Sequence, residues 1–155
     1  PAVLTRAWWR QAGLNDVQRA FHQNPQIFKS RKIFALAAAN TSDPRVIQFL
    51  VNQGFDVNQV DETGITPIFS AASSNGNPAI LRALVEKGAD VNRADEIYKT
   101  TPLMAAAYFQ RNPEIFKTLL ALGADPGIKD LNGQTAVDYA ERFNSREVIQ
   151  LLQQQ

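Results

Sequence analysis

The side chains that most often carry out catalysis are scarce in this sequence. It contains one histidine, His22, and no cysteine. A multi-histidine metal site, a thiolate nucleophile and a disulfide are therefore excluded within this chain. It also contains no glycine-rich phosphate loop, no H-E-x-x-H motif and no G-x-S-x-G motif. Because a general base needs converging partners, we interpret His22 as a surface residue and predict no catalytic residues and no enzymatic activity.

Aspartates are the remaining candidates for acid–base or metal chemistry. They recur at regular spacing, as Asp56, Asp61, Asp90, Asp95, Asp125 and Asp130. Aspartate is favoured in turns, because its carboxylate accepts hydrogen bonds from nearby backbone N–H groups. We therefore expect turn and cap roles for these residues, and we predict neither a metal site nor a cofactor.

The composition is that of one folded domain without a charge bias. The chain has 155 residues, of which 45% are hydrophobic, and 16 Lys and Arg against 15 Asp and Glu. This balance argues against nucleic acid as a partner, because such binders carry a strong basic excess. We interpret the short basic run Lys29–Lys32 as a solvated loop. The longest apolar runs, 33–39 and 103–109, are far shorter than the roughly 20 residues of a membrane span, so none is predicted.

Two motifs recur along the chain with a period of 34 or 35 residues. The first is Gly-x-Asp-x-Asn, which begins at Gly54, at Gly88 and, in degraded form, at Gly123. The second is Thr-Pro, which begins at Thr66 and Thr101 and has Thr135-Ala as a third copy. Because two independent motifs give the same period, the chain is predicted to consist of stacked copies of one structural unit.

Each unit is predicted to contain two helices followed by a hairpin-like loop. Threonine before proline is typical of a helix start. The threonine hydroxyl accepts a hydrogen bond from a free N–H group of the first turn, and proline has no N–H group that would need a partner there. The second helices start with the same device, at Asp43-Pro, Asn77-Pro and Asn112-Pro. Apolar residues then follow at helical spacing, and the glycine of each Gly-x-Asp motif ends the second helix. Alanine pairs keep the first helices thin, so that neighbouring units can pack closely.

This pattern resembles the ankyrin repeat. The matching segments are Gly64-Ile-Thr-Pro-Ile, Gly88-Ala-Asp-Val-Asn, Thr101-Pro-Leu-Met-Ala-Ala-Ala and Asn132-Gly-Gln-Thr-Ala, and the likeness covers about residues 31–152. It implies an all-α solenoid of about five helix pairs, with residues 1–155 forming one domain. We expect a divergent N-terminal capping pair over 1–29, repeats over 30–60, 61–94 and 95–129, and a C-terminal capping repeat over 130–155.

Within the N-terminal pair we expect helices over 3–12 and 15–23, with Trp8 and Trp9 covering the open end of the stack.

Three features depart from the family pattern. The family's histidine after Thr-Pro-Leu, which helps to tie hairpins together, is replaced by Phe69, Met104 and Asp138, so we expect looser hairpins. Each internal repeat carries one extra residue between its alanine pair and its second helix. The loop over 95–101 is one residue longer than its predecessor and has Ile97-Tyr98-Lys99 in place of a tip glycine.

The resemblance implies non-enzymatic protein binding through a concave surface made by the hairpin tips and the first helices. By position, we expect the partner-binding residues to be Asn40, Ser73, Ser74, Ile97, Tyr98, Lys99, Tyr108, Phe109, Arg111 and Arg142, and Phe143 shares the same surface. The tyrosines, Phe109 and Arg111 are the predicted hot spots, because buried aromatic residues and arginine dominate interface energies. The alternatives are that Phe109 packs inward and that the tyrosines are ordinary surface residues.

The chain looks most like small bacterial ankyrin proteins that stand alone, some of which are inhibitors or immunity proteins. The likeness suggests a periplasmic inhibitor that protects the producing cell by covering the active site of a partner enzyme, such as a peptidoglycan-degrading or otherwise toxic one. The alternative is a cytoplasmic scaffold or effector adaptor, which binds a host or cytosolic protein without inhibiting it. Because the chain begins at Pro1, we expect an upstream segment, for which a signal peptide is one candidate. We expect the free protein to be a monomer.

Overall fold

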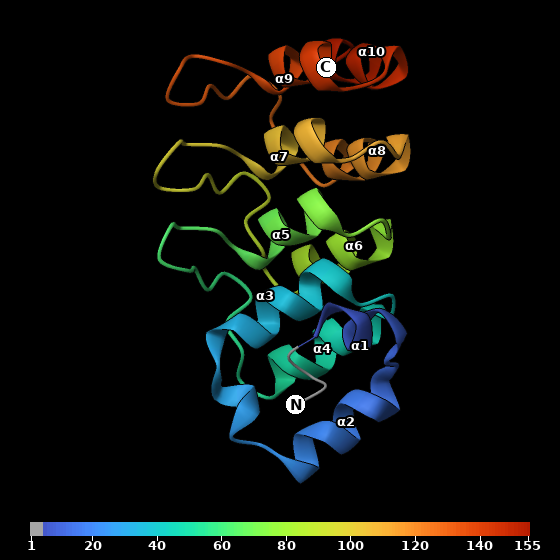
Figure 1. Ribbon diagram of the computed structural model, residues 1–155. Coiled ribbons are helices and arrows are strands. Elements are labelled where there is room, and N and C mark those ends of the chain that lie inside the picture. Colours follow the sequence, from blue (N-terminus) through green and yellow to red (C-terminus); the bar gives the residue numbers. More distant parts are fainter. Residues whose placement is uncertain (1–4) are drawn as a thin grey trace.

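The computed structural model describes residues 5–155, which form a stack of helix pairs (Figure 1). The helices are α1 (Arg6–Gln11), α2 (Leu14–Gln23), α3 (Arg31–Asn40), α4 (Pro44–Asn52), α5 (Pro67–Ser74), α6 (Pro78–Glu86), α7 (Pro102–Phe109), α8 (Pro113–Ala121), α9 (Ala136–Phe143) and α10 (Arg146–Gln153), with a 3₁₀ turn, η2 (Ile27–Lys29), before α3. The described part of the chain contains no strand. The predicted all-α solenoid is therefore confirmed, although the first two residues of the helix expected over 3–12 lie outside the described residues.

The helices begin and end where the cap signals predict. Hydroxyl oxygens accept hydrogen bonds from the third N–H of the first helices, at 3.3–3.4 Å, at Thr66, Thr101 and Thr135. Side chains before proline accept from the second N–H of α4, α6 and α8, each at 3.0 Å, at Asp43, Asn77 and Asn112. The second helices end in left-handed glycines, with φ of 102°, 96° and 99° at Gly54, Gly88 and Gly123.

The core follows the axis of the stack. The first helices α3, α5, α7 and α9 pack on one another in sequence, and the second helices α4, α6, α8 and α10 form a parallel outer row. Several alanines of the first helices are completely buried, among them Ala38, Ala72 and Ala107. Larger apolar side chains of the second helices, such as Leu84 and Leu119, are equally inaccessible. Stability in such an array comes from contacts between neighbouring pairs.

The N-terminal pair closes one end of this core. Helix α1 packs on α3, and α2 packs on α4. Trp9 is fully buried, with its ring centroid 4.9 Å from that of Trp8 and 6.5 Å from that of Phe28. Asp43, the cap of α4, also accepts a hydrogen bond from the backbone N–H of Leu14 at 3.1 Å. The two tryptophans thus cover the end of the stack as the sequence predicts, and one carboxylate joins the pair to the next repeat.

Polar side chains in the lengthened helix–helix loops bind one repeat to the next. The amide nitrogen of Asn75 donates to the carbonyl oxygens of Ala38 and Thr41, at 2.9 and 2.8 Å. The side chain of Gln110 donates in turn to the carbonyl oxygen of Asn75 at 2.9 Å. Asn144 repeats the double bond at the C-terminal end, at 2.9 and 2.7 Å. Each residue follows the last residue of a first helix, so the polar ladder fixes the spacing between the helices that carry the concave face.

Candidate partner-binding face

Three hairpin loops project from the same side of the stack, over residues 55–66, 89–101 and 124–135 (Figure 1). Each loop turns on an aspartate whose carboxylate accepts backbone N–H bonds. Asp61 accepts from Thr63 and Ile65 at 2.8 and 3.0 Å. Asp95 and Asp130 bind their own turns in the same manner, at 2.7–2.9 Å. The turn roles predicted for these three residues are therefore confirmed.

Asparagines tie neighbouring hairpins together. The amide nitrogen of Asn58 donates to the carbonyl oxygen of Gly88 at 2.9 Å, and its side-chain oxygen accepts from the N–H of Asp90 at 2.9 Å. Asn92 makes the same two bonds to the following hairpin, at 3.1 and 2.8 Å. The motif Gly-x-Asp-x-Asn thus both ends a helix and links consecutive repeats.

The tips of the second and third hairpins carry exposed apolar side chains, which we call the tip patch. Its members are Ile97, Tyr98 and Leu131, exposed by 51%, 63% and 65%. The backbone N–H of Leu131 donates to the carbonyl oxygen of Tyr98 at 2.8 Å, so the two tips are held side by side. Apolar side chains in this setting gain from burial against a partner.

Lys99 replaces a glycine at the tip of the second hairpin. Its φ is 57°, whereas the equivalent turns have Gly64 and Gly133 at φ of 82° and 77°. A left-handed conformation is unfavourable for a residue with a Cβ atom. The turn is held by Asp95, whose carboxylate accepts three backbone N–H bonds between residues 97 and 100. The lysine and the extra residue together present Tyr98 to solvent.

Three aromatic rings form a second exposed cluster, the aromatic patch, at the C-terminal ends of α7 and α9. Tyr108, Phe109 and Phe143 are 43%, 62% and 38% exposed. The Tyr108 ring centroid lies 4.6 Å from that of Phe109 and 4.4 Å from that of Phe143. The alternative in which Phe109 packs inward is therefore wrong, because the interior beside α7 is already filled by alanines and Leu103. The contiguous exposed rings make this patch a candidate interaction site.

The other predicted site residues fall into different settings. The guanidinium of Arg111 donates to the carbonyl oxygens of Tyr108 and Gln110, at 3.4 and 3.0 Å, so it caps the end of α7 beneath the aromatic patch. Arg142 is exposed next to Phe143 on α9. His22 is exposed on α2, as the sequence predicts.

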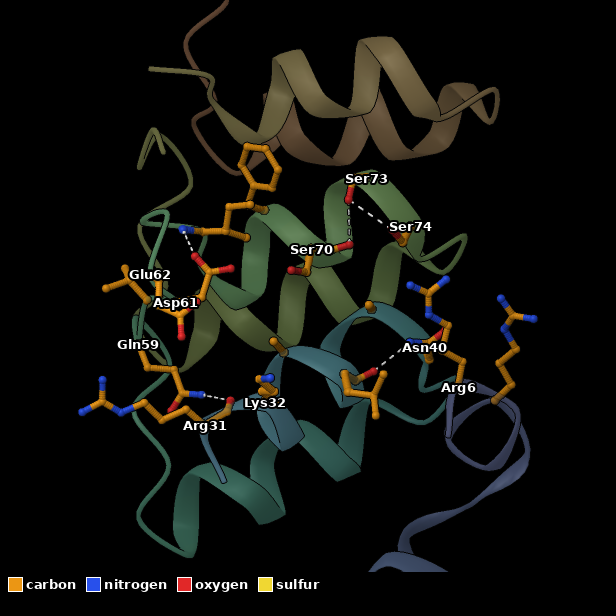
Figure 2. A pocket seen from close by; sticks show the side chains of 17 residues that line it. Arg6, Arg31, Lys32, Asn40, Gln59, Asp61, Glu62, Ser70, Ser73 and Ser74 are labelled. Carbon is orange, nitrogen blue, oxygen red and sulfur yellow. Dashed lines mark hydrogen bonds between the residues drawn. The ribbon is translucent and has the colours of Figure 1, made fainter. Parts of the chain in front are cut away.

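A groove lies between the first hairpin and helices α1, α3 and α5, and we call it the N-terminal groove (Figure 2). Its volume is about 680 Å³. Asn40, Ser73 and Ser74 line it, together with half-buried apolar side chains such as Leu36 and Phe69. Ser73 donates to the carbonyl oxygen of Ser70 at 3.1 Å, and the Ser73 and Ser74 oxygens are 3.2 Å apart. The predicted residues therefore form three groups, in the groove, at the tips and in the aromatic patch.

The turn aspartates Asp61 and Asp130 have lowered pKa values because hydrogen bonds stabilise their ionised carboxylates. Burial alone would raise the pKa of Asp61, but hydrogen bonds from Thr63, Ile65 and Gly64 outweigh it, so this pKa lies below its usual value. Burial also opposes a low pKa at Asp130, yet the hydrogen bond from Tyr139 and two backbone N–H groups lower it. Within residues 5–155, no group of three His, Cys, Asp or Glu side chains could hold a metal ion.

Comparison with known families identifies the repeat. A profile of ankyrin repeats, in three copies, matches residues 34–130. This chain belongs to the ankyrin-repeat family. Ankyrin repeats are protein-binding modules, so the exposed groups on the hairpins and first helices of this ankyrin protein are candidates for a protein partner. A search of curated proteins finds no match to the sequence. None of the helices described for the ankyrin stack is both long enough and apolar enough to span a bilayer.

Two apolar side chains of these patches are not among the predicted partner-binding residues: Phe143, which the sequence places on the same concave surface, and Leu131, which the sequence does not single out. Phe143 follows Phe109 by one repeat period, so the spacing alone places the two rings on neighbouring helices of the ankyrin stack. Leu131 follows directly after the turn aspartate Asp130, just as Glu96 follows Asp95. The repeat alignment therefore could have placed Leu131 at a hairpin tip. The contact of both with neighbouring site residues appears only in the structure.

Proposed function

We propose that this ankyrin protein is a bacterial inhibitor of the immunity type, which covers the active site of a partner enzyme. The aromatic patch is the observation that carries the proposal. Tyr108, Phe109 and Phe143 expose a contiguous aromatic surface on a stack whose other large apolar side chains are mostly buried. Aromatic anchors of this kind supply most of the binding energy in protein interfaces.

The tip patch supplies a second contact surface for the same partner. The loop that carries Tyr98 leads into the start of α7, whereas Phe109 ends this helix of eight residues. At about 1.5 Å per residue, the helix alone separates the two patches by roughly 12 Å, and the projecting loop adds to this distance. A partner that contacts both buries a substantial part of the roughly 1,600 Å² of a standard interface. Tips that project from the stack suit a concave partner surface, as an enzyme cleft provides.

The nature of the partner rests on the likeness to small bacterial ankyrin proteins. An inhibitor that protects the producing cell must be in the compartment in which the enzyme would damage that cell. For a cell-wall hydrolase this place is the periplasm, and we propose that location for this protein. Because the chain contains no cysteine, its stability does not depend on the redox state of the compartment.

Partner capture from fractionated cells, followed by an activity assay, tests the proposal. The baits are the wild type and the variant Tyr98→Ala/Tyr108→Ala/Phe109→Ala, with mass spectrometry to identify the proteins retained. We expect the wild type alone to retain a periplasmic hydrolase, and the purified hydrolase to lose activity on addition of the wild type. A partner whose activity is unchanged in the complex would identify an adaptor instead. Retention of the same proteins by both baits would show that the proposed face is wrong.

A further inference from the structure

The N-terminal groove is surrounded by cations that have no partner within the described chain. Four of its lining residues are basic, namely Arg6, Arg10, Arg31 and Lys32. All four are exposed, and none forms an ion pair or a side-chain hydrogen bond with another residue of the range 5–155. Figure 2 shows Arg31 beside the first hairpin and Arg6 at the opposite end of the groove. Positive charge is thus available along the whole groove.

The acids near the groove do not neutralise this charge. Asp61 and Glu62 are the two acidic residues that line it, so four cations and two acids give a local charge of +2. The carboxylate of Asp61 is engaged by its own turn, where it accepts from the Thr63 hydroxyl at 2.7 Å and from two backbone N–H groups. The whole chain carries a net charge of +1, so positive charge is concentrated here and offset elsewhere.

A second cavity, of about 570 Å³, extends the positive surface past the first hairpin. Lys29 and Arg93 line it, and Arg31 lines both cavities. Its one acid, Asp56, accepts a hydrogen bond from the backbone N–H of Asn58 at 2.9 Å. The two cavities adjoin at Arg31, Gln59 and Val60, which line both, and we call the six cations of the two cavities together the basic track.

The position of Arg31 and Lys32 on α3 is unfavourable for folding. Both lie in the first turn of the helix, where the dipole favours acidic side chains and disfavours cations. Ser30 makes no side-chain cap bond that would compensate. Two cations at this helix start therefore reduce the stability of the helix.

We infer that the basic track binds an acidic segment of the partner polypeptide, an inference that rests on the proposed function. The four unpaired cations of the groove supply the charge complementarity. The groove floor combines serine hydroxyls with half-buried apolar side chains such as Leu36 and Phe69. Such a surface suits a peptide that carries both acidic and aliphatic groups. Nucleic acid is disfavoured because the chain as a whole lacks a basic excess.

Fluorescence anisotropy with a defined probe tests this inference. The probe is a labelled octapeptide of alternating Glu and Ala, compared with a Gln/Ala peptide and a single-stranded oligothymidine of equal charge. We expect the acidic peptide to bind, and its affinity to fall about tenfold or more between about 50 and 500 mM salt. Arg31→Glu/Lys32→Glu should weaken binding by about tenfold or more. The same variant should unfold at an equal or higher temperature, because acids suit the first turn of α3.

The control variant is Arg146→Glu/Lys87→Glu. Arg146 also occupies the first turn of a helix, α10, but neither residue lines the basic track. We expect this control to bind the acidic peptide as the wild type does. The inference would be overturned if the Gln/Ala peptide bound as tightly as the acidic peptide. It would also be overturned if Arg31→Glu/Lys32→Glu, which we call the α3 reversal variant, bound the acidic peptide as the wild type does. Tighter binding of the oligonucleotide would make the track a nucleic-acid site and overturn it too.

The outcome is separable from that of the proposed function. Tyr108→Ala/Phe109→Ala should bind the acidic peptide normally, because the aromatic patch lies outside the groove. If the captured partner requires the aromatic patch but binds the α3 reversal variant normally, the inference alone is wrong. If the partner binds independently of both patches, the proposed face is wrong, whatever the peptide does.

Discussion

The side-chain oxygen of Asn58 accepts a hydrogen bond from the backbone N–H of Asp90, 32 residues later, at 2.9 Å. Its amide nitrogen donates to the carbonyl oxygen of Gly88 at the same distance. One side chain therefore pairs two backbone groups of the next hairpin. Because the hairpins carry the tip patch, this bond links the repeat motif to the shape of the candidate binding face.

Replacing Asn58 by alanine should destabilise the stack. The change removes two hydrogen bonds, each worth about 0.5–1.5 kcal/mol, so we expect the free energy of unfolding to fall by about 1–3 kcal/mol. Urea denaturation measures it. The control is Asn52→Ala, since Asn52 is exposed at the end of α4 and makes no side-chain hydrogen bond in the described structure. It should change stability by no more than about 0.5 kcal/mol. Equal effects of the two substitutions would contradict the linking role of Asn58.

Replacing Lys99 by glycine should relieve the backbone at the second tip. A left-handed residue with a Cβ atom costs about 1–2 kcal/mol, and glycine offsets part of this gain through its greater freedom in the unfolded chain. We expect Lys99→Gly to leave the free energy of unfolding unchanged or to raise it by up to about 1 kcal/mol. Lys99→Val should lower it, because a β-branched residue fits φ of 57° poorly. Thermal unfolding of both variants checks the order, and a stabilising valine would contradict it.

Local signals in the sequence were sufficient to predict the repeat architecture but not the contacts between repeats. The Thr-Pro caps and the glycine helix ends act within a few residues, so their physical meaning is readable from type and spacing. The bonds of Asn75 join residues 34 and 37 positions apart. Nothing in its neighbours distinguishes it from an ordinary loop asparagine. Phe109 shows the same limit, since only the filled interior beside α7 decides whether its ring faces in or out.

Acid should destabilise the protein through aspartates that are bound in the fold. The hydrogen bond from the Arg45 guanidinium is the main reason that the pKa of Asp43 lies below its ordinary value of 3.8. A depressed folded-state pKa means that the carboxylate stabilises the fold above about pH 4, and that this contribution is lost as the pH falls through the folded-state pKa. Asp61 and Asp130 have lowered pKa values as well, and they add to the effect.

Asp43→Asn separates this charge effect from capping. Asparagine remains a good N-cap for α4 but cannot ionise, so the variant should lose less stability than the wild type between about pH 5 and pH 2. Urea midpoints measured across this range check the difference. Parallel pH profiles for the two proteins would show that the pairing with Arg45 contributes nothing.

Alkali should act through Tyr139. Its burial and its hydrogen bond to Asp130, at 2.6 Å, raise its pKa from 10.0 to about 12. Because the folded-state pKa is raised, this interaction stabilises the fold below about pH 10 and is lost as the pH rises towards 12. Phenolate absorbance during titration of the folded protein should contain a component near pH 12. Tyr139→Phe should remove this component, and an unchanged titration curve would contradict the assignment.

Isothermal titration calorimetry of the purified partner with Tyr108→Ala/Phe109→Ala tests partner binding through the concave face most directly. Both side chains are largely exposed, so thermal unfolding should be nearly that of the wild type. Loss of two aromatic anchors should weaken binding by about 100-fold or more. Gln48→Ala/Arg146→Ala, on the outer helices α4 and α10, should bind normally. Unchanged affinity of the aromatic variant, or an equal loss in the outer-helix control, would contradict partner binding through the concave face.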